Sequence, residues 1–220
     1  MAALCGPDVR APGISRPHKS RLDEARLKST MRKIIVYIAT SADGFIARRD
    51  GAVDWLDRPP IKGNYGMGEF YGSIDTILWG RKTYDMVLRF QKEGKDGSDS
   101  YGAVKNYAFS RRAPKKVAPG FEFVKEPIPE FAQRLRSLAG KDIWMMGGAG
   151  IIASFLDQGE IDEFIIHVIP TFIGEGIPLI GPRHRTVPLK LISCRKFSDG
   201  VVRLHYEVMR EKPKKPGAKK

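Results

Sequence analysis

Strand-length apolar runs alternate with helix-period segments through most of this chain, and that alternation restricts its fold more than any other feature. The run at 33–40 (KIIVYIAT) is rich in β-branched residues and apolar on both faces, which is typical of a covered central strand. Four further runs have the same character: 75–79, 105–109, 142–146 and 163–169. Strands that alternate with helices indicate βαβ crossovers and a mostly parallel sheet.

Helical apolar spacing separates several of these runs. One apolar stripe spans residues 131–139 and is predicted to stop at Gly140. A second stripe spans residues 151–156 and is closed by Gly159. Both stripes predict helices that pack one face against the sheet.

The end of the chain breaks the alternation. Residues 189–197 and 201–209 are strand-like runs joined by Ser198-Asp199-Gly200, which predicts a β-hairpin. Apolar and polar residues alternate along the second run, so we expect a half-buried antiparallel strand. The polar side chains expected on one face of that strand are Arg203, His205 and Glu207.

Charge is concentrated at the two ends of the chain. The 38 Lys and Arg residues exceed the 25 Asp and Glu residues by 13. Residues 1–30 contribute +3 and residues 211–220 contribute +4, which leaves +6 for residues 31–210. Neither end carries a core-forming apolar pattern. The sequence therefore predicts a flexible basic leader (1–30), one domain (31–210) and a disordered Lys/Pro tail (211–220).

The composition also excludes several classes of protein. No apolar run approaches the ~20 residues that span a bilayer, so no membrane association is expected. The two cysteines, Cys5 and Cys194, cannot build a disulfide framework or a four-cysteine zinc site, and no metal is predicted. The first thirty residues lack a hydrophobic segment of signal-peptide length, so a cytoplasmic location is expected.

The most informative junction is the glycine-rich stretch Gly147-Gly148-Ala149-Gly150, where a strand leads into a helix. Glycines allow close approach of the backbone to a ligand, and a helix N-terminus offers free N–H groups to a phosphate. A Cβ at Gly148 is expected to meet a bound pyrophosphate or to require a φ that suits only glycine. A tight turn without a ligand is the structural alternative. The acid that should follow a Rossmann fingerprint about 20 residues later is missing, which disfavours a Rossmann domain.

Two more strand ends carry groups suited to phosphate. Gly80 leads into Arg81, Lys82 and Thr83, and cations at a helix N-terminus are unfavourable unless an anion binds there. Ser110-Arg111-Arg112 adds a second basic cluster after another strand. Three such junctions predict a ligand with several phosphates.

An acidic turn follows the first strand. Asp43-Gly44 is a common turn pair, and a plain turn is the simplest interpretation. If Asp43 lies beside the phosphate-suited strand ends, however, it is a carboxylate that faces a pocket.

These motifs together resemble a known family. Ala-x-Ser-x-Asp-Gly at 39–44, Gly-x-x-Thr at 80–83, Ser-Arg at 110–111 and Gly-Gly-x-Gly at 147–150 are similar to the dihydrofolate-reductase-like superfamily. The closer resemblance is to its riboflavin-biosynthesis branch, the reductase half of the bifunctional deaminase–reductase. It covers about residues 31–210 and implies an α/β fold with a mixed, mostly parallel central sheet, flanking helices and a C-terminal antiparallel hairpin.

The resemblance also implies a reaction and a set of site residues. It implies NADPH as the cofactor and hydride transfer to a C=N or C=O of a small heterocyclic or ribosylamino-pyrimidine substrate, as in a 5-amino-6-(5-phosphoribosylamino)uracil reductase. It assigns Asp43 to catalysis, with the proton delivered directly or through water, and His167 and Glu175 to the substrate side. For His167 a satisfied buried histidine is the alternative. It assigns cofactor contacts to Gly80, Arg81, Lys82, Thr83, Ser110, Arg111, Gly147, Gly148, Ala149 and Gly150.

Two departures from the family pattern narrow the expectation. True dihydrofolate reductases carry an acid on the first helix, whereas the stretch 65–70 has glycine there and Glu69 about one turn later. The cysteines cannot supply the zinc signature of a deaminase half. A dihydrofolate reductase proper and a nucleotide- or nucleic-acid-binding protein without turnover remain the alternatives. The expected partner is a small-molecule substrate. Nucleic-acid binding is disfavoured because the cationic residues concentrate in the tails. A homodimer is left open.

Overall fold

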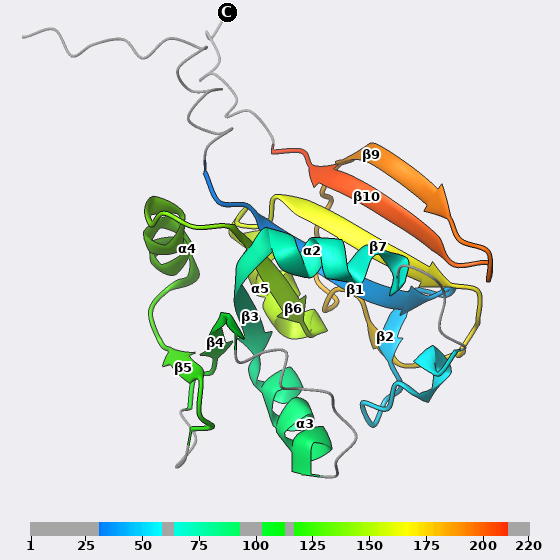
Figure 1. The fold of residues 1–220 in the computed structure, drawn as a ribbon, viewed down its shortest axis with the longest axis horizontal. Coiled ribbons are helices and arrows are strands. Elements are labelled where there is room, and N and C mark those ends of the chain that lie inside the picture. Colours follow the sequence, from blue (N-terminus) through cyan, green and yellow to red (C-terminus); the bar gives the residue numbers. More distant parts are fainter. Residues whose placement is uncertain (1–30, 59–63, 93–102, 113–116, 211–220) are drawn as a thin grey trace, which may run out of the picture. The chain divides into compact units, whose positions relative to one another are not determined.

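The computed structural model describes residues 31–58, 64–92, 103–112 and 117–210. The chain divides at residue 31 into two units, and the features below belong to the unit that starts at Arg32. Its main sheet has eight strands in the order β5-β4-β3-β6-β1-β7-β10-β9 (Figure 1). The strands of this sheet are β1 (Ile34–Ser41), β3 (Ile74–Gly80), β4 (Lys105–Phe109), β5 (Phe121–Val124), β6 (Asp142–Gly147), β7 (Glu163–Ile169), β9 (Leu189–Lys196) and β10 (Val202–Val208).

The sheet is parallel except at one edge. β1 pairs in parallel with β6 and β7, β3 pairs in parallel with β4 and β6, and β4 pairs in parallel with β5. β10 runs antiparallel to both β7 and β9. The predicted mostly parallel sheet with a C-terminal hairpin is confirmed. The carboxyl ends of β1, β3, β4, β6 and β7 therefore meet at one edge, where α/β folds place their ligands.

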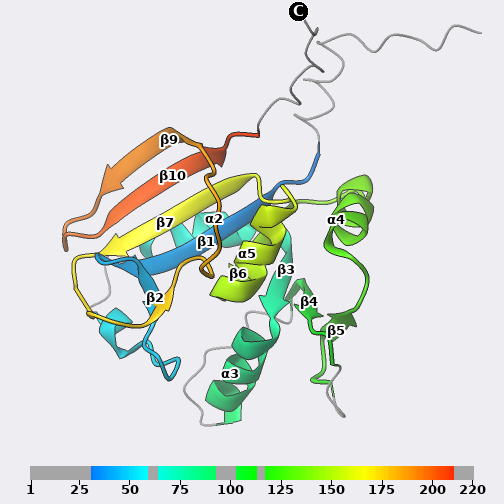
Figure 2. The same cartoon turned by 180° about the vertical axis from the view of Figure 1, so that it is seen from behind.

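Helices cover both faces of the sheet. Alternate residues of β1 point to opposite faces, so Ile34 joins one core cluster and Ile35 joins the other. The first cluster includes Phe131 of α4 (Ile128–Ser137) and Phe155 of α5 (Ala149–Asp157). Figure 2 shows α5 in front of the sheet, and Figure 1 shows α2 on the other side.

The second cluster belongs to the opposite face. It includes Phe70 of α2 (Met67–Ser73) and Tyr84 of α3 (Arg81–Lys92). Both side chains are buried, and each is worth about 1.5–3 kcal/mol of transfer free energy. None of the described helices has the length and apolar character of a membrane-crossing helix.

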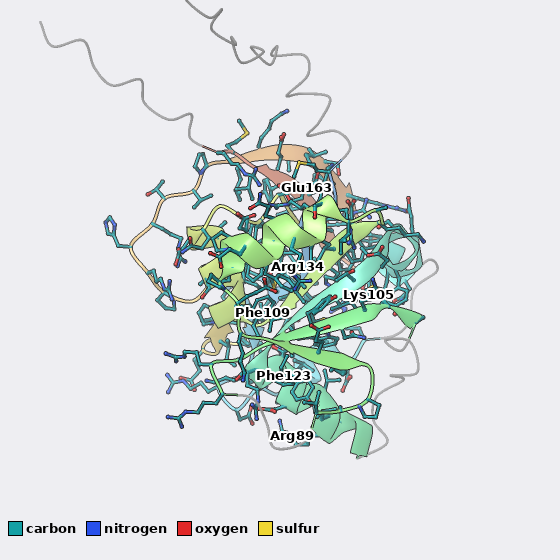
Figure 3. The ribbon with its side chains drawn as sticks, turned by 90° about the vertical axis from the view of Figure 1, so that its left-hand side faces the viewer. Arg89, Lys105, Phe109, Phe123, Arg134 and Glu163 are labelled. Atoms are coloured by element: carbon teal, nitrogen blue, oxygen red, sulfur yellow. The ribbon has the colours of Figure 1, made fainter. Side chains whose placement is uncertain are left out.

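Aromatic side chains of α4 and α5 pack against the end of β4. Phe109 lies 4.9 Å from Phe131 and 5.2 Å from Phe155, both edge to face between ring centroids. Arg134 of α4 lies over the Phe131 ring at 5.1 Å. Figure 3 looks onto this side of the molecule and labels Phe109 and Arg134.

One sequence expectation about the helices needs correction. α4 ends at Ser137 rather than at Gly140, because Leu138 is already extended and 44% exposed. Gly140 instead allows a close approach, since a Cβ there would collide with the Asp75 carboxylate. The expected half-buried antiparallel strand at the end of the chain is confirmed, because most residues of β10, including Arg203 and His205, are half-buried.

Several short elements escaped the sequence patterns. They are β2 (Phe45–Ala47), β5, β8 (Ile177–Pro178) and the 3₁₀ turns η1 (Asp54–Leu56) and η2 (Asn64–Gly66). β2 and β8 pair with each other in a separate two-stranded sheet. Segments of two to four residues carry too little periodicity to be recognised.

Candidate active site

The ends of β3 and β6 are in near contact through glycine. A Cβ on Gly80 would lie 3.0 Å from the Cγ2 of Ile151, 3.2 Å from the carbonyl oxygen of Gly147 and 3.3 Å from the amide nitrogen of Gly148. Two of those three neighbours are backbone atoms that cannot move aside as a flexible side chain can. The close approach therefore requires glycine at position 80.

The turn from β6 into α5 needs its glycines for different reasons. Gly147 has φ +107°, a backbone conformation that favours glycine, and the Gly147–Gly148 peptide bond is cis. Gly148 has φ −84° and ψ −158°, which any residue can adopt. Of the two reasons expected for glycine at position 148, the glycine-only φ is therefore wrong, and that requirement belongs to Gly147. The expected contact of a Cβ on Gly148 with a pyrophosphate stays a prediction.

Gly148 faces the first turn of α3. A Cβ on Gly148 would lie 3.3 Å from the Oγ1 of Thr83 and 3.7 Å from the Cδ1 of Ile46. The structure thus brings together Gly80, Thr83, Gly147 and Gly148 from two separate sequence motifs.

The N-terminus of α5 is open to an anion. Gly148 is the N-cap and supplies no side-chain cap, and the first turn contains no acidic residue. The first N–H groups of a helix lack intrahelical acceptors and carry the positive end of the helix dipole. Ala149 and Gly150 therefore present amide groups suited to phosphate.

A basic turn flanks the same edge of the sheet. The Nη1 of Arg81 donates a 2.9 Å hydrogen bond to the carbonyl of Arg112, and its Nε donates to Asp85. The Oγ of Ser110 donates to the same carbonyl at 2.6 Å. Arg81 thus holds the 110–112 turn against α3, whereas the exposed Lys82 and Arg111 are open to solvent.

Asp43 is a fixed carboxylate in the turn after β1. It accepts hydrogen bonds from the Oγ of Ser41 (2.5 Å) and from the amides of Gly174 (2.7 Å) and Ile173 (3.2 Å). The Ser41 hydrogen bond, together with the backbone amides, lowers the pKa of Asp43. Asp43 is therefore ionised near neutral pH and ties the 41–47 turn to the loop after β7.

The two loops tied by Asp43 border the glycine turn. The amide of Leu179 donates to the carbonyl of Gly44 at 3.1 Å, and the amide of Gly181 donates to the carbonyl of Ala149 at 3.1 Å. Glu175 lies in the same loop but points outward, where it pairs with Arg49 at 2.8 Å. The structure therefore places Asp43 beside the predicted phosphate site and Glu175 on the surface.

His167 belongs to a different, buried cluster. It is 4% exposed, and its Nε2 lies 3.3 Å from the carbonyl oxygen of Tyr65 and 3.4 Å from the hydroxyl of Tyr37. Burial lowers the pKa of His167 to about 4, so the ring is neutral near pH 7. This agrees with a satisfied buried histidine.

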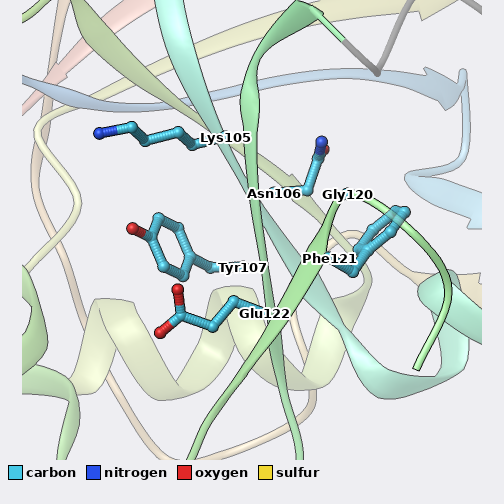
Figure 4. Close-up of a pocket in the computed structure, with 6 residues that line it drawn as sticks. All are labelled: Lys105, Asn106, Tyr107, Gly120, Phe121 and Glu122. Carbon is cyan, nitrogen blue, oxygen red and sulfur yellow. The ribbon is translucent and has the colours of Figure 1, made fainter. Parts of the chain in front are cut away.

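A surface depression of about 470 Å³ lies elsewhere (Figure 4). It is at the amino-terminal part of β4 and β5, whereas the predicted site residues gather at the carboxyl ends of the strands. Its lining residues are Lys105, Asn106, Tyr107, Gly120, Phe121 and Glu122. None of the predicted site residues lines it.

The sequence patterns missed the residues that surround His167. Tyr37 lies inside an apolar strand run, and Tyr65 and Arg203 come from distant parts of the chain. The polar residues that alternate with apolar ones at 201–209 were the only sequence signal for Arg203. The strand register, which the sequence does not give, places Arg203 next to His167.

The fold and the arrangement of the strand ends define a dihydrofolate-reductase-like α/β protein. The model of the RibD C-terminal domain matches residues 32–203, and the chain belongs to that family. It is 36% identical to the uncharacterized protein YwjB of Bacillus subtilis over 175 residues, which are 80% of this chain and 97% of YwjB.

Solved structures show the same fold. A Shewanella protein provisionally named for riboflavin biosynthesis superposes with a TM-score of 0.69 at 27% identity, covering 81% of this chain and 99% of that one. A Thermotoga maritima deaminase/5-amino-6-(5-phosphoribosylamino)uracil reductase gives 0.62 at 15% identity, covering 85% and 59%. Enterococcus faecalis dihydrofolate reductase, solved with NADP(H), gives 0.54 at 13% identity, covering 80% and 96%. The chain therefore has a riboflavin-pathway-type reductase fold.

Proposed function

We propose that this chain is an NADPH-dependent reductase that acts on a C=N or C=O of a small ribosylamino-pyrimidine or related heterocycle. The observation that carries the proposal is the meeting of Gly80, Thr83, Gly147 and Gly148 beside the uncapped N-terminus of α5. Backbone amides, a hydroxyl and a helix dipole converge there, which is the donor set that a pyrophosphate needs. Membership of the RibD C-terminal family supports the same assignment.

The residues at this edge fit a dinucleotide with an additional phosphate. The amides of residues 147–150 and the Thr83 hydroxyl would hold the pyrophosphate. Ser110 and the exposed Arg111 would meet a 2′-phosphate, since a guanidinium suits bidentate contact with phosphate oxygens. Arg81 would act mainly by holding that turn in place, because two of its nitrogens already donate to Asp85 and Arg112.

NADPH, when bound, supplies the hydride. The chain's own contribution is to hold cofactor and substrate in a reactive orientation at the strand ends. Asp43 fixes the loops that border the glycine turn, and its lowered pKa keeps it ionised. An ionised carboxylate cannot donate a proton, so of the two routes considered for Asp43 we favour delivery through a water molecule.

A dihydrofolate reductase proper is less well supported. Glu69, the acid on α2, is exposed, and Gly66, about one turn before it, offers no side chain. A proton donor is therefore missing from the position where dihydrofolate reductases have one.

Binding and turnover test the proposal separately. Calorimetric titration should show tighter binding of NADPH than of NADH, and Gly148→Val should abolish both, because its side chain would crowd Thr83. Loss of NADPH absorbance is then followed with 5-amino-6-(5-phosphoribosylamino)uracil and with dihydrofolate as substrates. If the protein binds neither nucleotide, the proposed function is wrong.

A further inference from the structure

A row of four residues crosses the sheet on the face that carries α2. Ala39 of β1 pairs with His167 of β7, His167 pairs with Arg203 of β10, and Arg203 pairs with Arg195 of β9. Directly paired residues project to the same face of a sheet. Two arginines therefore stand side by side, next to a buried neutral histidine.

Arg203 has no partner among the described residues. Its Nε is buried without a hydrogen-bond acceptor, and its Nη1 lies 3.0 Å from the position of a Cβ on Gly66. A buried donor without an acceptor destabilises the protein, and the cost is larger for a charged group. The half-buried guanidinium thus lacks the acceptor that its environment calls for.

The neighbours of Arg203 do not compensate its charge. Tyr37 and His167 are uncharged near neutral pH, because burial raises the pKa of Tyr37 to about 12 and lowers that of His167 to about 4. Arg195 adds a second positive charge, and its guanidinium lies over the Phe197 ring, 5.0 Å from the ring centroid. Like charges directly opposite on paired strands repel each other.

Other basic groups nearby are paired with carboxylates. Arg58 donates to Asp199, and the Nε2 of His205 lies 2.8 Å from Glu163. Arg203 and Arg195, in contrast, have no carboxylate partner among the described residues.

The segment that covers Arg203 is strained and firmly held. Asn64 and Tyr65 have φ of +41° and +56°, values that non-glycine residues seldom adopt. The Tyr65 hydroxyl donates to Asp199 at 2.6 Å, and its carbonyl faces Tyr37 and His167. Backbone strain of this kind often accompanies a ligand site.

We propose that Arg203 and Arg195 form an anion subsite that binds the phosphate monoester of the substrate. The guanidinium groups of two directly paired residues match the two charges of a phosphate, and a guanidinium can donate two parallel hydrogen bonds to phosphate oxygens. The identity of the ligand as a reductase substrate rests on the proposed function, whereas the anion subsite itself does not. Ala39 lies two residues before Ser41, so this row crosses the sheet ~7 Å before the carboxyl end of β1.

Ribose 5-phosphate is the probe, and ribose is its uncharged counterpart. Calorimetric titration of the full chain, with and without saturating NADP⁺, should show binding of ribose 5-phosphate and none of ribose. Saturation with NADP⁺ fills the cofactor phosphate positions, so the remaining binding reports a separate subsite. Arg203→Met should weaken ribose 5-phosphate about tenfold to hundredfold. Arg195→Met should weaken it less, because Arg195 is exposed.

Matched variants separate this subsite from general charge effects and from folding defects. Arg89→Met removes an exposed arginine of α3 (Figure 3) and should leave ribose 5-phosphate binding unchanged. Arg203→Lys keeps the charge without the planar fork and should bind between wild type and Arg203→Met, which keeps the test usable if the latter does not fold. Equal binding of ribose and ribose 5-phosphate, or wild-type affinity in Arg203→Met, overturns the subsite. NADPH titration of the same variants judges the proposed function independently.

Discussion

Gly80→Ala tests the contact between the ends of β3 and β6. The new methyl carbon would sit 3.0 Å from the Ile151 side chain and 3.2–3.3 Å from two backbone atoms of Gly147 and Gly148, all closer than ordinary van der Waals contact. Overpacking of this kind typically costs about 1–3 kcal/mol. For a domain of this size that lowers the melting temperature by about 2–12 °C. Because the methyl pushes the glycine turn away from Thr83, NADPH binding should weaken as well.

Gly150→Ala is the matched control for this substitution. A Cβ on Gly150 meets nothing within 4 Å, and alanine suits a helix better than glycine. Its melting temperature, followed by circular dichroism beside that of Gly80→Ala, should equal or exceed that of wild type. The close approach is refuted if Gly80→Ala has the wild-type melting temperature and NADPH affinity. Equal destabilisation of both variants would show that the effect is not specific to position 80.

Three further predictions follow from the same geometry. Arg111→Ala should cost about 1–3 kcal/mol of NADPH binding and leave NADH nearly unchanged, because only NADPH carries the 2′-phosphate; equal losses in calorimetry would contradict the assignment. Asp43→Asn should preserve NADPH binding but reduce turnover by about 10²–10⁴-fold, so a normal rate across the pH range would make Asp43 a turn residue only. The folded-state pKa of His167 is lowered from 6.5 to about 4, so its contribution to stability is present above pH 6.5 and is lost as the pH falls toward 4. Chemical denaturation should show that loss, roughly 3 kcal/mol at most, and His167→Asn should remove it.

The regular part of the fold was predictable because each long element carries its own signal. The runs at 105–109 and 163–169 coincide with β4 and β7, since central covered strands are largely apolar on both faces. β2 and β8 exist only because the 41–47 turn and the loop after β7 meet in space, as in the hydrogen bond from Leu179 to Gly44. The end of α4 could not be predicted from periodicity, because Leu138 continues the apolar stripe and yet lies outside the helix.

The candidate site was predictable only where its chemistry is local. Gly80 and the glycines of residues 147–150 each predict a turn from the sequence. The structure shows that these two turns are in close contact. Which glycine needs its special φ could not be read locally, and it is Gly147 rather than Gly148. The sequence could not identify Arg203 as a candidate site residue. Its position next to His167 follows from the register of β10 against β7, and its Nε has no acceptor among the described residues.

The charge states in the two regions limit where a proton for the proposed reduction can come from. Asp43 has a lowered pKa and is ionised, His167 titrates only near pH 4, and burial leaves the Tyr37 hydroxyl with a pKa of about 12. None of the three is a competent proton donor near neutral pH, because an effective general acid has a pKa close to the working pH. Delivery through a water molecule held by the ionised Asp43 is the route that we propose, and it agrees with the loss of turnover expected for Asp43→Asn. Turnover should consequently show no inflection near pH 6.5, and a bell-shaped profile centred there would point to an acid other than these three.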